Sequence, residues 1–133
     1  MFMTEYGYRG LLVWQKAKTL ATDVYRLTNS ESIKRDFSLV DQMRRSAVSA
    51  PSNIAEGDER QSDKDSVRFF RIAKGSLAEL ATQLEIAHDA GYLKTAQVEP
   101  LMTQCAELGK MLGALIRARS HSPPRAQSPK PQA

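Results

Sequence analysis

Side chains that could hold a metal or act in catalysis are few in this 133-residue sequence. His88 has Glu85 and Asp89 nearby but no second histidine at ligand spacing, whereas a metal site needs three or four converging ligands. The single cysteine, Cys105, falls on an apolar stripe, where a buried thiol behaves as a small hydrophobe rather than as a nucleophile. We therefore expect no metal, no cofactor and no enzymatic activity.

Asn53 and Glu56 are the polar pair that stands out within an apolar pattern. Because they are three residues apart, they share one face of a helix, and one interpretation is a polar site inside a helical core. Pro51 precedes them and supports a second interpretation, in which the two side chains satisfy backbone groups freed by the proline or cap a neighbouring helix. We favour the second interpretation.

Basic side chains provide the candidate binding surface. The candidates for contact with nucleic acid are Arg44, Arg45, Arg68, Arg71 and Lys74. Arginine suits phosphate because its planar guanidinium makes bidentate contacts. Acidic residues crowd the same region, so a solvated, salt-bridged face is the alternative. The net charge is +4 and the pI about 9.4, but without Arg125 and Lys130 near the C-terminus the charge is about +2, a mild bias toward an anionic partner.

Four amphipathic helices must position these residues. Apolar residues recur at spacings of three and four along residues 11–28, 35–56, 63–90 and 95–119. With short links and no strand pattern, this periodicity predicts an all-α, antiparallel up-and-down four-helix bundle. On the third helix the expected core side chains are Ser66, Phe69, Ala73, Leu77, Leu80, Leu84 and Ala87. We expect a flexible lead-in over 1–10, the bundle domain over 11–119 and a disordered, proline-rich tail over 120–133.

Local signals mark where the helices bend and end. Pro51 lies inside the second helix and should kink it or break it near Ala50. Gly57 and Gly91 are expected to stop the second and third helices. Ser62 is expected in the N-cap region of the third helix, and Thr95 is a candidate cap for the fourth.

The flanks beside the apolar stripes carry side chains that a monomer does not require. These candidate oligomer-interface residues are Trp14, Tyr25, Phe37, Val48, Gly75, Ala78 and Thr82. One explanation is that helices in a small bundle bury wide faces. The other is self-association, because added apolar flanks often mark an interface and small residues let another helix approach closely. We expect a homo-oligomer.

The location of the protein follows from what the sequence lacks. No run of 18 apolar residues is available to span a membrane, and the N-terminus carries Glu5 without a long apolar stretch typical of a signal peptide. We expect a cytoplasmic protein with no membrane contact.

Three sequence motifs point to a known family. They are LVWQKA at 12–17, QMRRSAVSAPSNIAEG at 42–57 and RFFRIAKGSLAEL at 68–80. With these motifs, the sequence resembles the bacterial four-helix bundle proteins encoded in intervening sequences of 23S ribosomal RNA genes. The resemblance spans about residues 9–117, and its most specific part is PSNIAEG at 51–57. Asp58 and Glu59 depart from the family pattern, in which an aromatic residue more usually follows the glycine.

The resemblance implies a bundle that assembles as a ring, a pentamer, with no established enzymatic activity. Related bundle proteins are accessory factors of diversity-generating retroelements, which associate with a reverse transcriptase and bind nucleic acid through a basic surface. For this sequence the resemblance implies binding of RNA or DNA through the basic residues of the second and third helices. The alternative is a protein-binding adaptor, for example for a reverse transcriptase or a ribosome-associated factor.

Overall fold

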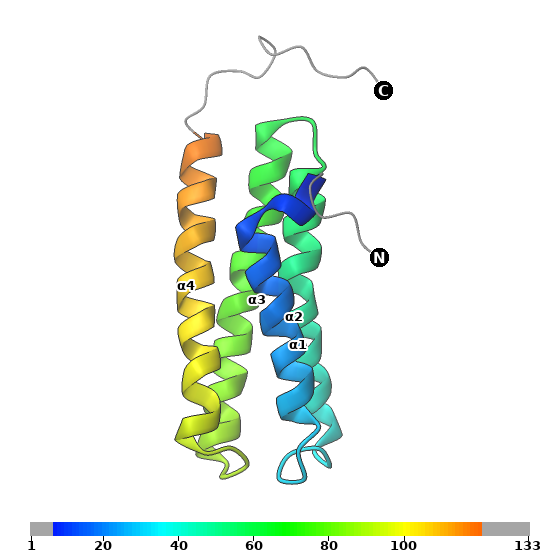
Figure 1. Ribbon diagram of the computed structural model, residues 1–133, viewed down its shortest axis with the longest axis vertical. Coiled ribbons are helices and arrows are strands. Elements are labelled where there is room, and N and C mark those ends of the chain that lie inside the picture. The colour runs from blue at the N-terminus through cyan, green and yellow to red at the C-terminus, as the bar shows by residue number, and fades with distance from the viewer. Residues whose placement is uncertain (1–6, 121–133) are drawn as a thin grey trace.

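The computed structural model describes residues 7–120, and each predicted amphipathic segment forms a helix in it. The elements are η1 (Gly7–Gly10), α1 (Leu12–Thr28), α2 (Phe37–Asp58), α3 (Asp63–Asp89) and α4 (Thr95–Ser120). Each α-helix runs antiparallel to the previous one and α1 closes against α4, so the chain is an up-and-down four-helix bundle (Figure 1). The described residues contain no strand, and no helix among them is long and apolar enough to cross a membrane.

The two ends of the chain differ in what the structure describes. Residues 7–10, which we expected to belong to a flexible lead-in, form the single 3-10 turn η1 that packs on α1 and α2. The Tyr8 ring meets the Trp14 ring edge-on at 5.0 Å between centroids, and the Gln15 amide donates to the Arg9 carbonyl at 2.7 Å. The tail expected over 120–133, apart from Ser120, lies outside the described residues, as do residues 1–6.

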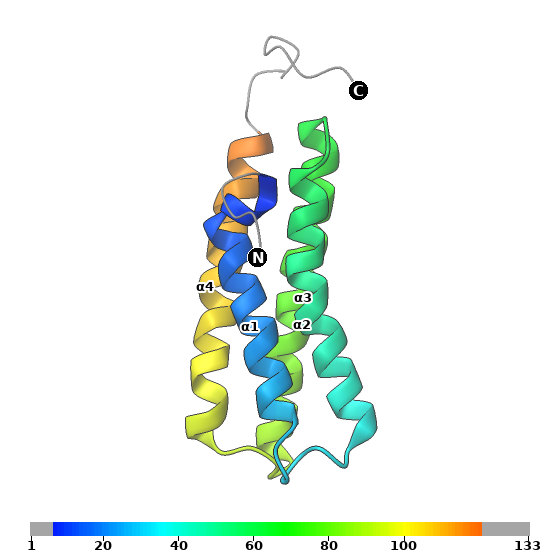
Figure 2. The ribbon, with the colours of Figure 1, turned by 45° about the vertical axis from the view of Figure 1, so that its right-hand side comes forward.

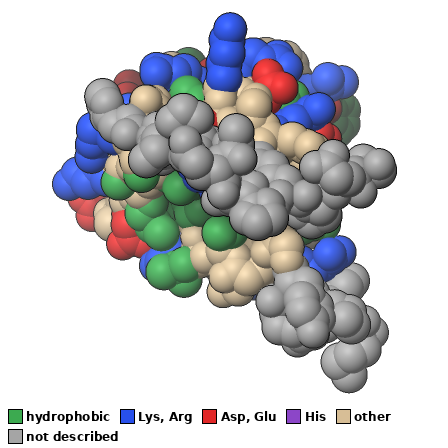
Figure 3. Space-filling view, turned by 90° about the horizontal axis from the view of Figure 1, so that it is seen from above, with side chains coloured by type: hydrophobic (Ala, Val, Ile, Leu, Met, Phe, Trp, Pro, Cys, Tyr) green, Lys and Arg blue, Asp and Glu red, His purple; other side chains and the backbone are tan. Residues whose placement is uncertain are grey.

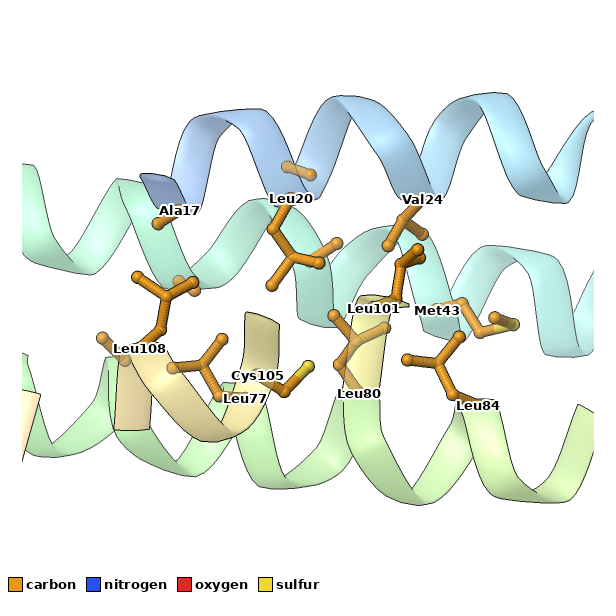
Figure 4. Close-up of a cluster of buried hydrophobic side chains, with 14 of the residues drawn as sticks. Ala17, Leu20, Val24, Met43, Leu77, Leu80, Leu84, Leu101, Cys105 and Leu108 are labelled. Carbon is orange, nitrogen blue, oxygen red and sulfur yellow. The ribbon is translucent and has the colours of Figure 1, made fainter. Parts of the chain in front are cut away.

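The core is a column of aliphatic side chains contributed by all four helices. Figure 4 shows side chains from each helix pointing into this shared space, among them Leu20, Met43, Leu80 and Leu101. The apolar stripes predicted for α1, α2 and α4 supply most of this core. Burial of each large aliphatic side chain stabilises the fold by about 1.5–3 kcal/mol, so this column is the main source of stability.

One predicted core residue of α3 is wrong. Phe70, not Phe69, is fully buried. The Phe69 ring is half-buried, and the guanidinium groups of Arg60 and Arg68 lie 4.5 and 4.6 Å from its centroid. Neighbouring helical residues differ by 100° in direction, so the periodicity alone did not decide which of two adjacent phenylalanines faces the core.

Two of the predicted helix ends are confirmed by their hydrogen bonds. The Ser62 hydroxyl accepts from the Asp65 N–H at 3.2 Å, which caps the start of α3. Gly91 adopts φ +85°, and the Tyr92 N–H donates to the Ala87 carbonyl at 3.0 Å, the pattern of a Schellman motif. The chain therefore turns from α3 into α4 by a local signal that the sequence contains.

The predicted cap at Thr95 is wrong by one residue. Thr95 is already the first helical residue of α4, and the Lys94 N–H is satisfied instead by the Gln97 side chain at 2.9 Å, one half of a capping box. The Thr95 hydroxyl lies 3.0 Å from Nε2 of His88, which links the two ends of the α3–α4 turn.

The start of α2 carries a cap that also joins two ends of the bundle. One Asp36 oxygen accepts from the Leu39 N–H at 3.1 Å, and the other accepts from the Tyr92 hydroxyl at 3.0 Å. The hydrogen bond from the Tyr92 hydroxyl to Asp36 is the largest cause that raises the pKa of the Tyr92 phenol, and the negative charge of Asp36 is the second. The α1–α2 link and the α3–α4 turn are thereby held together.

α2 continues through Pro51 from Phe37 to Asp58, so the predicted break near Ala50 does not occur. In Figure 2 the lower, cyan part of α2 leans away from the other helices, which is consistent with the kink expected at this proline.

Gly57 does not end α2 as predicted. It lies inside the helix, and its φ is not positive, so it has no role as a left-handed cap. Instead α3 approaches it closely: a Cβ added here would lie 2.6 Å from Cε1 of Phe70 and 3.1 Å from the Ser66 carbonyl oxygen. The Ser66 hydroxyl also donates to the Gly57 carbonyl at 2.7 Å. Glycine at this position sets the distance between α2 and α3.

We predict that Gly57→Ala lowers the free energy of unfolding by about 1–3 kcal/mol, because the new methyl group must displace the packed Phe70 ring. Gly75→Ala is the matched control, because a Cβ at Gly75 meets nothing within 4 Å in the middle of the same hairpin. The control should be neutral or stabilising by up to about 1 kcal/mol, through helix propensity alone. Urea unfolding measures both, and equal effects of the two variants would contradict the close contact.

Candidate nucleic-acid interface

The five predicted cations do not meet on one surface of the α2–α3 hairpin. The register of this hairpin is shown by Ser49 and Ser76, whose hydroxyl oxygens lie 2.7 Å apart. Arg44 and Arg45 precede Ser49 by about one turn and are therefore level with residues beyond Ser76, farther along α3 than any predicted cation. The two helices thus carry two separate groups of cations.

Both cations of the α2 group have local partners. Nε of Arg44 donates to the Thr28 hydroxyl at 2.9 Å, and its guanidinium lies 4.6 Å from the centroid of the Tyr25 ring. Arg45 is exposed and pairs with Asp41 at 2.9 Å, one helical turn away. Such an exposed ion pair adds little stability but cancels the charge of Arg45 locally.

Two cations of the α3 group, Arg71 and Lys74, lie beside α4 and are joined there by a cation that the sequence did not point to. Arg71, Lys74 and Arg117 line an open groove of about 590 Å³ between α3 and α4. Its other lining residues are Gly75, Ala78, Gly113 and Ile116. A Cβ added to Gly113 would lie 3.6 Å from Nη1 of Arg117 and 4.0 Å from Nζ of Lys74, so the two charged groups flank this glycine. We call this the basic groove.

Arg117 was missed because its relation to the others is entirely tertiary. It lies 43 residues after Lys74, near the end of α4, and no local pattern joins the two. Its position on the outer side of the α4 stripe was visible in the sequence, but only the packing of α4 on α3 makes it a neighbour of Lys74.

Acidic residues near the α2–α3 turn are occupied by other cations. Arg119 from the end of α4 lies 3.9 Å from both Asp58 and Asp63, in a half-buried position. Glu56 pairs with Arg60 at 2.8 Å. The salt-bridged alternative is therefore realised at the turn itself, whereas the described residues place no carboxylate in the lining of the basic groove.

Charged side chains of both signs lie on the end of the bundle that carries the α2–α3 turn. Figure 3, which looks onto this end, shows Lys and Arg side chains at several places on the rim, with Asp and Glu among them. The guanidinium of Arg68 lies over the Phe69 ring, and Arg68 does not line the basic groove. The rim is thus mixed in sign, and the basic groove differs from it by having cations alone.

The polar residues considered for catalysis do not converge. The Asn53 amide donates to the Ser49 carbonyl at 2.9 Å and to the Ser49 hydroxyl at 3.0 Å, whereas Glu56 pairs with Arg60. His88 is at the other end of α3, 3.3 Å from Asp89. Within residues 7–120, no group of three or more His, Cys, Asp or Glu side chains is arranged to hold a metal ion.

The predicted interface residues fall on two faces. Tyr25, Phe37 and Val48 are exposed on the α1–α2 side, and Trp14 of α1 is half-buried against Tyr8 of η1. Gly75, Ala78 and Thr82 are exposed on α3, where two further apolar side chains, Ile72 and Ile86, also reach solvent. Spacings of three, seven and four residues place Ile72, Gly75, Thr82 and Ile86 on one stripe, which we call the α3 outer stripe.

These observations define the class of the molecule, an all-α bundle of four antiparallel helices. The comparisons with known proteins refine this class. The model of the family described as 23S rRNA-intervening sequence protein matches residues 9–114, and the chain belongs to this family. The resemblance carried by the three motifs is thereby confirmed.

A solved structure agrees with the family assignment. The chain is similar to a Bacteroides thetaiotaomicron protein described as a protein with unknown function from the S23 ribosomal protein family. The two share 26% sequence identity over 80% of this chain and 99% of that chain, with a TM-score of 0.74. No curated protein matches this sequence.

Cys105 provides a test of how α4 packs in the core. Burial raises the pKa of its thiol to about 11, because the thiolate is poorly solvated in the core of α4. The folded state therefore favours the neutral thiol, so stability from this group is intact below pH 9 and falls as the pH rises toward 11.

We predict that iodoacetamide at pH 8 modifies Cys105 at least about tenfold more slowly in the native protein than in urea-unfolded protein, since both the thiolate fraction and access are reduced. The sequence has no other cysteine, so mass spectrometry reports this site alone. Equal rates in the two states would show that this part of the core is open.

Proposed function

We propose that this protein is a non-enzymatic, oligomeric protein that binds nucleic acid through the basic groove. The observation that carries the proposal is the convergence of Arg71, Lys74 and Arg117 from two helices on a lining without carboxylates. The proposed contact therefore lies on α3 and α4, whereas the sequence suggested α2 and α3.

The shape and chemistry of the basic groove suit a phosphate backbone. Two arginines offer planar forks for phosphate oxygens, and Lys74 adds a mobile point charge. Gly75, Ala78 and Gly113 lack bulky side chains, so a sugar–phosphate chain can approach the helix backbones closely. Affinity from such contacts comes largely from release of counterions and is independent of base sequence.

We predict that the triple variant Arg71→Gln, Lys74→Gln and Arg117→Gln weakens binding to RNA and DNA and makes it less dependent on salt. If each cation neutralises one phosphate, the slope of log affinity against log salt falls by about three. Fluorescence anisotropy at a series of salt concentrations measures both quantities.

Lys94→Gln is the control for this experiment. It removes an exposed positive charge at the opposite end of the bundle, and the Lys94 contact at the start of α4 is made by its backbone. It should leave the salt slope nearly unchanged. If Lys94→Gln lost as much affinity per charge removed as the triple variant, the attraction would be diffuse and not centred on the basic groove. Absence of binding by the wild-type protein at low salt would overturn the proposal.

Self-association is the second part of the proposal, with the ring of five copies implied by the family resemblance as the expected assembly. The α3 outer stripe supports it, because Ile72 and Ile86 are 43% and 50% exposed and provide an apolar surface for a helix from another copy. An assembly would also repeat the basic groove around an axis, so that several weak contacts act together.

We predict that light scattering reports a mass several times 14.8 kDa and that Ile86→Glu lowers it, because the new charge would be buried in the contact between copies. Leu12→Glu is the matched control, since Leu12 is also exposed but lies on α1. A monomer at micromolar concentration would overturn the assembly. If both variants lowered the mass equally, association would not depend on the α3 outer stripe.

The α3 outer stripe also favours one alternative function, a protein-binding adaptor. The same exposed isoleucines would then contact a different protein, such as a reverse transcriptase or a ribosome-associated factor. A pull-down that survives nuclease treatment and is lost in Ile86→Glu, combined with a monomeric mass in light scattering, would favour the adaptor over the nucleic-acid-binding oligomer.

A further inference from the structure

Phe37 is the most exposed large apolar side chain of the described residues, with 77% of its surface accessible. It is the first residue of α2 and lies at the lower end of the bundle, beside the α1–α2 link (Figure 1). Two hollows of about 680 and 520 Å³ adjoin it, and Phe37 and Arg35 line both of them. The ring is therefore accessible from two sides rather than laid against the protein.

Cations surround this ring. Arg35 is exposed and has no ion-pair partner among the described residues, and Lys34 and Arg44 line the larger hollow together with it. Nε of Arg44 donates to the Thr28 hydroxyl, and its guanidinium lies over the Tyr25 ring at 4.6 Å from the centroid. We call the set Tyr25, Lys34, Arg35, Phe37 and Arg44 the α1–α2 corner.

Each carboxylate near the α1–α2 corner has an ion-pair or hydrogen-bond partner. Asp41 pairs with Arg45, Asp36 accepts from the Leu39 N–H and the Tyr92 hydroxyl, and Glu31 pairs with Lys34. Asp36 keeps its negative charge, because both of its donors are neutral, but Arg35 and Arg44 together outweigh it, so the α1–α2 corner has a net positive charge.

This composition suits a contact with nucleic acid better than a contact with another copy of the chain. Aromatic residues and Arg are frequent in protein interfaces as well, but Lys, Asp and Glu are depleted there, and Lys34, Asp36 and Asp41 line the two hollows beside Phe37. Exposed aromatic rings interleaved with arginines are the pattern by which proteins bind single strands, with bases stacked on the rings and phosphates on the cations. A paired base cannot use such a ring, since its faces are covered by its neighbours in the duplex.

We propose that the α1–α2 corner holds an unpaired nucleotide, with its base stacked on Phe37 and its phosphates on Arg35 and Arg44. This inference rests on the proposed nucleic-acid binding and adds a selectivity to it. The basic groove faces α4 and contacts the backbone of any nucleic acid, whereas the α1–α2 corner on another side of the bundle favours a single strand. The sequence alone assigned the residues of the α1–α2 corner to different roles, with Phe37 and Tyr25 expected in self-association and Arg44 in nucleic-acid binding.

The test compares Phe37→Ala with wild-type protein by fluorescence anisotropy, using labelled single-stranded oligo(dT) of about 12 nucleotides and a duplex of the same length. We expect binding of the single strand to weaken at least about fivefold and binding of the duplex to change less than about twofold, because only the stacked base is lost. Phe37→Tyr, which keeps an aromatic ring, should retain single-strand binding. Leu12→Ala, which shortens an exposed apolar side chain elsewhere on the bundle, should change neither.

The outcomes separate this inference from the proposed function. If Phe37→Ala binds the single strand as wild type does while the basic-groove variant loses both ligands, the α1–α2 corner is overturned and the groove stands. If wild-type protein binds neither ligand at low salt, both are overturned. If Phe37→Ala instead lowers the mass in light scattering with unchanged nucleic-acid binding, the α1–α2 corner is a contact between copies and the inference is also overturned. Because Phe37 is exposed, loss of folding in this variant is not expected, and circular dichroism verifies it.

Discussion

The close contact between Gly57 and Phe70 is the constraint on which the rest of this bundle depends. Glycine allows the fully buried Phe70 ring to pack directly on the backbone of α2. The Arg119 guanidinium lies 5.5 Å from the centroid of that ring and reaches Asp58 and Asp63 on either side of the α2–α3 turn. One buried ring thus joins three helices at this end, and α4 is fixed against α3 by the same contact.

The position of the basic groove follows from that arrangement. Arg117 and Arg119 are two residues apart on α4, so they point in different directions from the helix. While Arg119 neutralises the acidic residues of the turn, Arg117 is directed toward Lys74. A single helix end therefore supplies one arginine for stability and one for the proposed binding of phosphate. The acidic residues that reduced the apparent basic character of the sequence do not line the groove.

The α1–α2 side of the bundle is organised by a different contact. Arg44 bridges α2 to the end of α1 through Thr28, a hydroxyl that is itself fully buried and donates to the Val24 carbonyl at 2.7 Å. This fixes the arginine over Tyr25 and in the hollow beside Phe37. Side chains of the α1–α2 corner that the sequence assigned to different roles lie on one surface, because the short link between α1 and α2 brings the helix ends together.

The sequence by itself determined the four helices, most of the core, the caps at Ser62 and Gly91 and the family, because periodicity, capping and motifs are local properties of a chain. It did not determine which adjacent phenylalanine is buried, why Gly57 is a glycine, or which cations are neighbours. Those depend on the rotation and register of whole helices, which are set by packing between residues far apart in the chain. Only the tertiary structure therefore separated Arg44 from Lys74 and placed Arg117 beside Lys74.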